Sequence, residues 1–349
     1  MAIYRKAGNR WNSLITLLAG VAFLLSAAAA HAQQNWNAKV GGQNKDMGMQ
    51  AVAFLPNELW IHAGDTVTWT FASDDIHTVT FLTVGQTYPF DFTQGCPPIS
   101  TSGSSFDGST CVSSAPSTSG QTFEVTFPRT GNYEIVCLIH SQMFGMIHVL
   151  DGSLPLPHDQ AFYDKQAQEQ EKALLADDDD ADNGESTSHS MGSMLMARVV
   201  PLHTVVTGTG QIAATPGGQQ SLSIMRFMPG TITIHTGDTV EWANLDPSTG
   251  HTITFGTEPA DLFDPSCSPS PCSVKTDADG ALHATISGPD QTVHSGAIVA
   301  LYEDEAGVPQ FAPFPPTRFR VTFTKAGTYP YECSFHDNLG MRGKVIVLP

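Results

Sequence analysis

The sequence of 349 residues has few basic side chains: 16 lysines and arginines stand against 34 aspartates and glutamates, and the formal net charge is −18. Residues 1–32 hold three basic and no acidic side chains, so their removal takes the charge from −18 to −21. Binding of nucleic acid needs a basic surface, and this composition argues against it. We interpret the acidity mainly as a source of solubility, because much of it lies in one segment. Attraction of a basic partner protein is the second interpretation.

The chain also lacks any apolar run beyond residues 14–30 that is long enough to cross a bilayer. Three basic residues precede this run, and Ala30-His31-Ala32 follows it with small residues where signal peptidases cut. The pattern predicts a signal peptide over residues 1–32; an uncleaved anchor is the alternative, disfavoured because the run is short and rich in alanine. We expect an exported protein, periplasmic or secreted, with no stable membrane insertion afterwards.

Cysteine is scarce, and its six copies fall into two sets. Two stand alone, each three residues before a histidine, and the other four form one close pair in each half of the chain. In an oxidising compartment each close pair predicts a local disulfide, although pairing across the halves stays open. The pairs are Cys96 with Cys111 and Cys267 with Cys272.

An internal repeat organises the chain. Pro56–Trp69 recurs as Pro229–Trp242, and a second set of positions recurs at one constant offset. Val67, Trp69 and Phe71 alternate with threonine, and a Gly-Asp turn precedes this run and its counterpart in the second copy, which predicts short strands packed as a sandwich. We therefore expect an all-β protein of two domains, residues 33–150 and 200–349. The second set is Phe123, Val125, Phe127, Gly131, Tyr133, Cys137 and His140, matched by Phe319, Val321, Phe323, Gly327, Tyr329, Cys333 and His336.

Residues 151–199 between the copies predict an acidic linker with one short helix. Good helix formers run from Asp159, a candidate N-cap, to Ala176, and four aspartates follow at 177–180. The rest of the linker is small and polar, which favours a flexible tether. It also contains a histidine and three methionines that could capture cuprous ion, although a flexible segment of this composition more often has no metal-binding role. These residues are His189, Met191, Met194 and Met196.

Each copy contains a set of soft and intermediate metal ligands. Cys137 is followed by His140 and Met143, and Cys333 by His336 and Met341. A second histidine lies upstream in each half, in the segments His77-Thr-Val-Thr-Phe81 and His251-Thr-Ile-Thr-Phe255. One thiolate, two imidazoles and a weak axial thioether form a blue-copper site, whereas structural zinc normally takes more Cys or His and no Met.

With these motifs, both halves resemble cupredoxins of the plastocyanin, amicyanin and pseudoazurin kind, over nearly all of 35–150 and 200–349. The resemblance implies a Greek-key β-sandwich with a type 1 copper at one end of each domain. The spacing of Met341 is similar to plastocyanin, and the shorter spacing of Met143 is similar to amicyanin. Met146 competes with Met143, but the match of Met143-x-Gly145 with Met341-x-Gly343 favours Met143. The implied ligands are His77, Cys137, His140 and Met143, and His251, Cys333, His336 and Met341.

The sequence lacks any His-x-His pair, and no histidine adjoins Cys137 or Cys333. Catalytic copper in multicopper oxidases and copper nitrite reductases needs such additional imidazoles, so we expect an electron carrier that exchanges single electrons with redox partner proteins and is not an enzyme. Those enzyme classes, and copper storage or delivery, are the alternatives. The long insertions 82–120 and 256–316 either cover the copper ends or form a docking surface.

Overall fold

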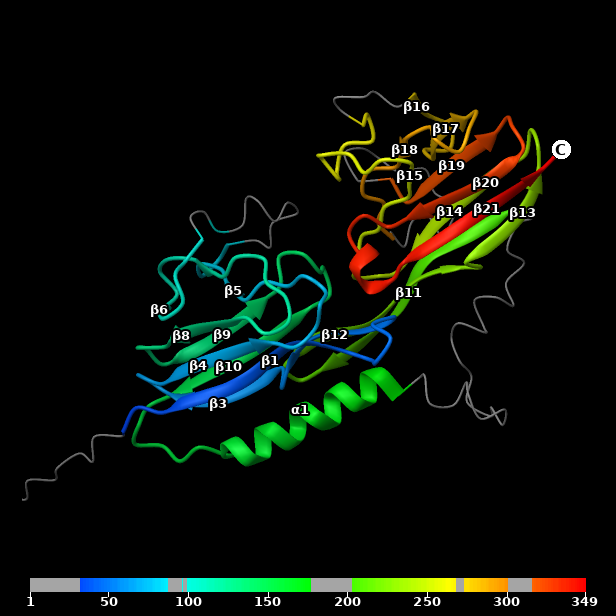
Figure 1. Cartoon of the computed structure of the whole chain (residues 1–349). Coiled ribbons are helices and arrows are strands. Elements are labelled where there is room, and N and C mark those ends of the chain that lie inside the picture. The colour runs from blue at the N-terminus through cyan, green and yellow to red at the C-terminus, as the bar shows by residue number, and fades with distance from the viewer. Residues whose placement is uncertain (1–31, 87–95, 97–98, 177–202, 268–272, 301–315) are drawn as a thin grey trace, which may run out of the picture. The chain divides into compact units, whose positions relative to one another are not determined.

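The structure, a computed structural model, describes residues 32–86, 96, 99–176, 203–267, 273–300 and 316–349. The predicted signal peptide, the aspartate run at 177–180, the methionines of the linker and Cys272 lie outside the described residues. Strands dominate the described part of the chain, as predicted, and α1 is its one α-helix (Figure 1). In that same part, no helix is long and apolar enough to span a membrane.

The first repeat, residues 33–150, is a sandwich whose core is filled from two sheets. Strands β3-β10-β9-β5-β7 form one sheet, and β2-β1-β4-β8-β6 belong to the other. Val67 and Trp69 of β4 are buried as their alternation predicts, because successive side chains of a strand point to opposite faces. The strands are β1 (Asn35–Gln43), β2 (Met49–Leu55), β3 (Glu58–His62), β4 (Thr66–Phe71), β5 (Thr80–Phe81), β6 (Ser104–Ser105), β7 (Val112–Ser113), β8 (Thr122–Thr126), β9 (Gly131–Val136) and β10 (Phe144–Leu150).

The second repeat, residues 200–349, has the same arrangement. Its sheets are β13-β21-β20-β15-β18 and β12-β11-β14-β19-β17-β16. Two parallel strand pairs occur in both repeats. The pair β1 and β4 corresponds to β11 and β14, and the pair β3 and β10 corresponds to β13 and β21. The elements are β11 (Thr204–Thr215), β12 (Gly218–Met228), β13 (Thr231–His235), β14 (Thr239–Leu245), β15 (Thr254–Phe255), β16 (Val274–Thr276), β17 (Leu282–Ile286), β18 (Val293–His294), β19 (Arg318–Phe323), β20 (Gly327–Glu332), the 3₁₀ turn η3 (Asp337–Leu339) and β21 (Arg342–Leu348).

The two repeats share one sheet. β2 pairs antiparallel with β12, in a register that runs from Val52 opposite Ser221 to Met49 opposite Ile224. This pairing joins the larger sheets into one of eleven strands. An edge strand exposes unpaired N–H and C=O groups, and each of these two edges satisfies the other. The sequence predicted two domains joined by a flexible tether, of which residues 177–199 lie outside the described residues. Both repeats lie within one compact unit, Gln33–Pro349.

The linker helix α1 (Gln160–Leu175) begins at its predicted N-cap, where the Asp159 carboxylate accepts the Phe162 N–H at 3.0 Å. The helix packs on β1 and β2. Tyr163 is buried against Trp36, with ring centroids 5.7 Å apart, and its hydroxyl accepts the Trp60 N–H at 2.9 Å. The helical part of the linker is therefore fastened to the first repeat.

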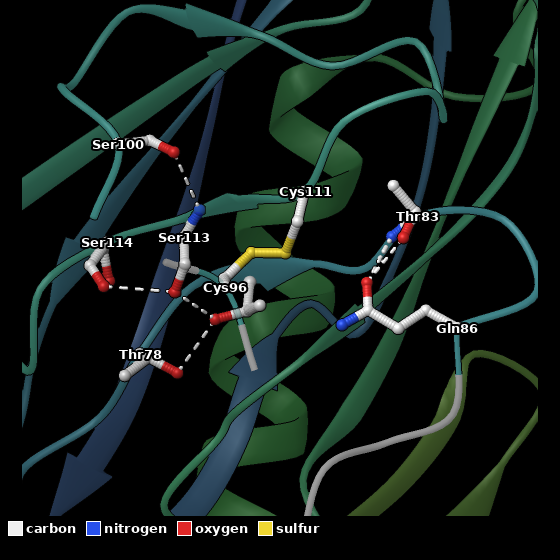
Figure 2. Close-up of a disulfide and its surroundings, with 9 residues drawn as sticks. Thr78, Thr83, Gln86, Cys96, Ser100, Cys111, Ser113 and Ser114 are labelled. Carbon is white, nitrogen blue, oxygen red and sulfur yellow. Dashed lines mark hydrogen bonds between the residues drawn. A yellow bond between two sulfur atoms is a disulfide. The ribbon is translucent and has the colours of Figure 1, made fainter. Parts of the chain in front are cut away.

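The predicted disulfide between Cys96 and Cys111 is present (Figure 2). It lies in the first long insertion, which β7 connects to the core. In β7, Ser113 Oγ hydrogen-bonds Thr80 Oγ1 of β5 at 2.7 Å. Thr80 in turn donates to Thr78 Oγ1 at 3.1 Å. The insertion thus reaches the segment that carries His77. The second predicted pair includes Cys272, outside the described residues, and stays a prediction.

Candidate metal centres

Two clusters of possible metal ligands occur in the described residues, one in each repeat. The first joins His77, Cys137 and His140, and the second joins His251, Cys333 and His336. In each cluster one atom from every residue lies within 4.8 Å of the others. All six side chains are buried, and neither Cys137 nor Cys333 forms a disulfide. The structure therefore brings together the three strong ligands predicted for each copper site.

Each cysteine follows the strand before the last, and its loop closes in the same way in both repeats. The Cys137 N–H donates to the Met143 carbonyl at 3.1 Å, and the Cys333 N–H donates to the Met341 carbonyl at 3.1 Å. Both methionines are fully buried within the cores that contain the thiols. The predicted axial residues thus hold equivalent places in the two loops.

Met146, the competing axial candidate, lies on β10 and is only partly buried. Its neighbour Ile147 points into the core, and successive strand residues alternate between faces. Met146 therefore lies on the face of β10 away from the core that contains Cys137 and Met143. This placement favours Met143 as the axial ligand, as the repeat predicted.

The upstream histidines are held by the two long insertions. His77 exchanges two backbone hydrogen bonds with Ser117, both 2.9 Å long, in an isolated bridge. His251 exchanges the equivalent pair with Ile298, at 2.9 and 2.8 Å. These insertions were expected to cover the copper end or to form a docking surface. Their return segments fix the backbone of one ligand in each site, and the covering or docking role stays a prediction.

A glycine at a β-bulge makes room for each upstream histidine, and sequence analysis missed both. Gly41 and Gly208 have φ values of 71° and 72°, a region that L side chains rarely adopt. A Cβ on Gly41 would lie 2.7 Å from His77 Nε2, and one on Gly208 would lie 2.2 Å from His251 Nε2. The bulges shift the strand register at these glycines, which lie outside the repeated motifs that the sequence made visible.

Each thiol also accepts hydrogen bonds from the threonine after the upstream histidine. The Thr78 N–H lies 3.4 Å from Cys137 Sγ, and the Thr252 N–H lies 3.3 Å from Cys333 Sγ. The threonine hydroxyls accept the N–H of the residue after each cysteine, at 2.8 and 2.7 Å. The repeated His-Thr dipeptide therefore supplies a ligand and a partner that steadies the sulfur.

The buried groups of each cluster shift one another's pKa. Burial alone would raise the pKa of the Cys137 thiol, but His140 and His77 outweigh it and hold that pKa well below its usual range. The same opposition lowers the pKa of the Cys333 thiol. Burial would lower the pKa of His140, but Asp75 and Cys137 raise it. The clusters favour thiolates, the form of cysteine that binds metal.

The ring nitrogens turned away from the thiols meet different partners in the two sites. His77 Nε2 lies 3.0 Å from Ser73 Oγ, whereas His251 Nε2 lies 3.7 Å from the buried Asp246 carboxylate. Ser73 and Asp246 are equivalent, four residues after the repeated tryptophan. Outer partners of this kind orient an imidazole ligand and tune its basicity. Neither partner could be predicted from the sequence, because neither residue belongs to a ligand motif.

The donor set and one unpaired atom fit a copper ion. His77 Nδ1 is buried without a hydrogen-bond partner, which is costly unless the nitrogen binds something. In the other site, His251 Nδ1 and His336 Nδ1 lie 3.1 Å apart, and Cys333 Sγ is 3.8 and 3.4 Å from them. Two imidazole nitrogens and one thiolate turned toward a common point, with methionine in the same loop, match a type 1 copper site.

We predict that Gly41→Ala displaces the His77 ring and weakens copper binding in the first site alone. Gly64→Ala is the matched control: its φ is also positive, at 96°, but a Cβ there meets no atom within 4 Å. Both variants incur the backbone cost of about 1–2 kcal/mol. Imidazole ¹H–¹⁵N spectra of the metal-free protein should report a shift of His77 in Gly41→Ala only. Equal shifts in both variants would contradict the close-approach argument.

A family model and several solved structures match parts of this chain. Residues 39–150 and 313–348 match the family described as copper binding proteins, plastocyanin/azurin family. Among solved structures, an amicyanin from Paracoccus versutus is 22% identical over 33% of this chain and 81% of its own, with a TM-score of 0.23. An oxidised plastocyanin from Dryopteris crassirhizoma is 18% identical over 41% of this chain and 98% of its own, with a TM-score of 0.20. Two regions of this chain, one in each repeat, therefore match the model of the plastocyanin/azurin family of copper binding proteins.

Proposed function

We propose that this protein is an exported carrier of single electrons with one type 1 copper ion in each repeat. One observation carries the proposal: the same buried set of one thiol and two imidazoles, closed by a methionine loop, occurs twice. When bound, copper supplies a couple that gains or loses one electron. The proposed ligands are His77, Cys137, His140 and Met143 in the first site and His251, Cys333, His336 and Met341 in the second.

The protein's own part is to hold the ligands in one geometry for both oxidation states. Two soft sulfurs suit cuprous ion and two imidazoles suit cupric ion, so the donor set serves either state with little rearrangement. Backbone pairs fix each upstream histidine, and the threonine N–H groups hold each sulfur. Burial of all three strong ligands keeps water away from the centre. The proposed reaction partners are redox proteins that dock from outside.

An enzyme would need an open copper position and further histidines near it. In the part of the chain that the structure describes, no third group of three His, Cys, Asp or Glu side chains meets the spacing for a metal site. Copper storage or delivery would favour exchangeable ligands, whereas these are buried and held by strands. We therefore propose electron transfer without turnover of oxygen, phenols or nitrite; steady turnover of any of them by the pure protein would overturn this proposal.

We predict two blue coppers per chain. Cys137→Ser should remove one thiolate-to-copper absorption band and one copper, and Cys333→Ser should remove the other, since each thiol serves one site. Metal analysis and visible spectra measure this. Replacing the disulfide cysteine Cys96 by serine is the control and should leave both bands. A single blue copper in the fully loaded protein would refute the two-site proposal.

We predict that Met143→Leu raises the reduction potential of the first site and alters its spectrum, because a weak axial donor tunes the couple. Met146→Leu is the matched control and should change the potential much less, since Met146 points away from the core. Spectroelectrochemistry of the Cys333→Ser background isolates the first site. If Met146→Leu has the larger effect, the proposed axial assignment is wrong.

A further inference from the structure

One carboxylate lies between the two candidate copper sites. Asp75 Oδ2 is 3.3 Å from His140 Nε2, and Asp75 Oδ1 is 3.6 Å from His336 Nε2. The carboxylate belongs to the first repeat, as does His140, whereas His336 belongs to the second. All three side chains are almost fully buried, at 2%, 1% and 6% exposed. One acidic group thus contacts a proposed ligand from each site.

Other contacts hold the two ligand loops against each other around Asp75. Asn338 Nδ2, in the second ligand loop, donates to the Asp74 carbonyl at 3.1 Å. Ser141 Oγ, in the first ligand loop, donates to the Pro247 carbonyl at 3.4 Å. Asp74 and Pro247 are equivalent positions, five residues after the repeated tryptophan. Each ligand loop therefore contacts the segment that leads to the other site's upstream histidine.

Arg226 fixes the same interface from β12. Its guanidinium donates to the Leu339 carbonyl in the second ligand loop at 2.8 Å. It also donates to the Asp46 carbonyl of the first repeat at 2.9 Å and lies 3.3 Å from the Asp46 carboxylate. Together with the pairing of β2 and β12, these contacts set the distance between the two histidine edges.

The tautomers follow from the geometry. In both His140 and His336, Nδ1 faces the thiol of its own site and Nε2 faces Asp75. With Nδ1 on the metal, each Nε2 would carry its proton, 3.3 and 3.6 Å from the two oxygens of the Asp75 carboxylate. A buried carboxylate is costly unless it is compensated, and these two imidazoles supply the compensation. Asp75 also accepts the Ile76 N–H at 2.8 Å, which fixes its orientation.

We propose that His140, Asp75 and His336 form a built-in route by which the two sites exchange one electron within the molecule. This inference rests on the proposed function, since it needs copper in both sites. In the exchange, one site is oxidised by one electron and the other is reduced by one. No bond forms or breaks, no proton leaves and no co-reactant is needed. Asp75 is a positioning residue, because it acts through the two histidines.

The test compares Asp75→Asn with Asp74→Asn in the full chain. Asp74 is the matched control, because its carboxylate contacts Gln43 while its carbonyl, unchanged by the substitution, contacts Asn338. In the metal-free protein, imidazole ¹H–¹⁵N spectra should report shifts of both His140 and His336 Nε2 in Asp75→Asn and neither in Asp74→Asn. In the copper protein, pulse reduction followed by visible spectroscopy should reveal exchange between the sites that Asp75→Asn slows at least about tenfold.

A wild-type measurement keeps the inference falsifiable if Asp75→Asn does not fold. Exchange between the sites should proceed at a rate that is independent of protein concentration, because both sites belong to one chain. A rate proportional to concentration, or no exchange in a protein with two blue coppers, would overturn the route and leave the proposed function standing. A protein that binds no blue copper would overturn the proposed function itself.

Discussion

The antiparallel pairing of β2 with β12 is the contact on which the placement of the two sites relative to each other depends. It satisfies the open backbone edges of two sandwiches with each other and makes one eleven-stranded sheet. Because the pairing fixes register as well as direction, it also fixes which loops meet at the ends of the strands. The loops that meet carry the proposed copper ligands. The structure thus combines two repeats, each with a proposed ligand set, in one arrangement that buries the edges of His140 and His336.

Burial of those edges changes how the repeats can work. A copper site whose imidazole edge is open can exchange electrons directly with a docked protein through that edge. Here the corresponding edges face Asp75, between the repeats. The short path from each site therefore leads to the other site, and partners outside must approach from other faces. On the proposed route, the duplicated domains hold two connected sites rather than two independent carriers.

The strands, the start of the helix and the two ligand clusters could be predicted from the sequence, because each depends on residues that are close in the chain. The strands followed from alternating side chains such as Val67 and Trp69, and the helix start followed from Asp159. The two ligand clusters followed from Cys-x-x-His motifs and a repeated His-Thr segment, because the ligands of one loop are fixed by their spacing. These features depend on neighbours in the chain, and their patterns are therefore visible without a structure.

What could not be predicted depends on contacts between distant segments. Gly41 and Gly208 matter because a bulge brings each against a histidine far along the chain. Asp75 looks like one acid among many until the pairing of two edge strands places His336 beside it. The acidic linker predicted two domains that move independently. Its composition describes the linker itself and carries no information on the strand edges of the two repeats. Strand edges that pair with each other leave no distinct signature in either strand's own sequence.

The central claim is that two copper sites face each other across one fixed interface. Electron paramagnetic resonance of the fully oxidised protein tests it most directly, with the singly loaded Cys137→Ser and Cys333→Ser proteins as references. If the sites are held together through Asp75, the two cupric spins interact, and the spectrum of the wild-type protein is broadened relative to the sum of the two references. A wild-type spectrum that equals that sum would contradict the account.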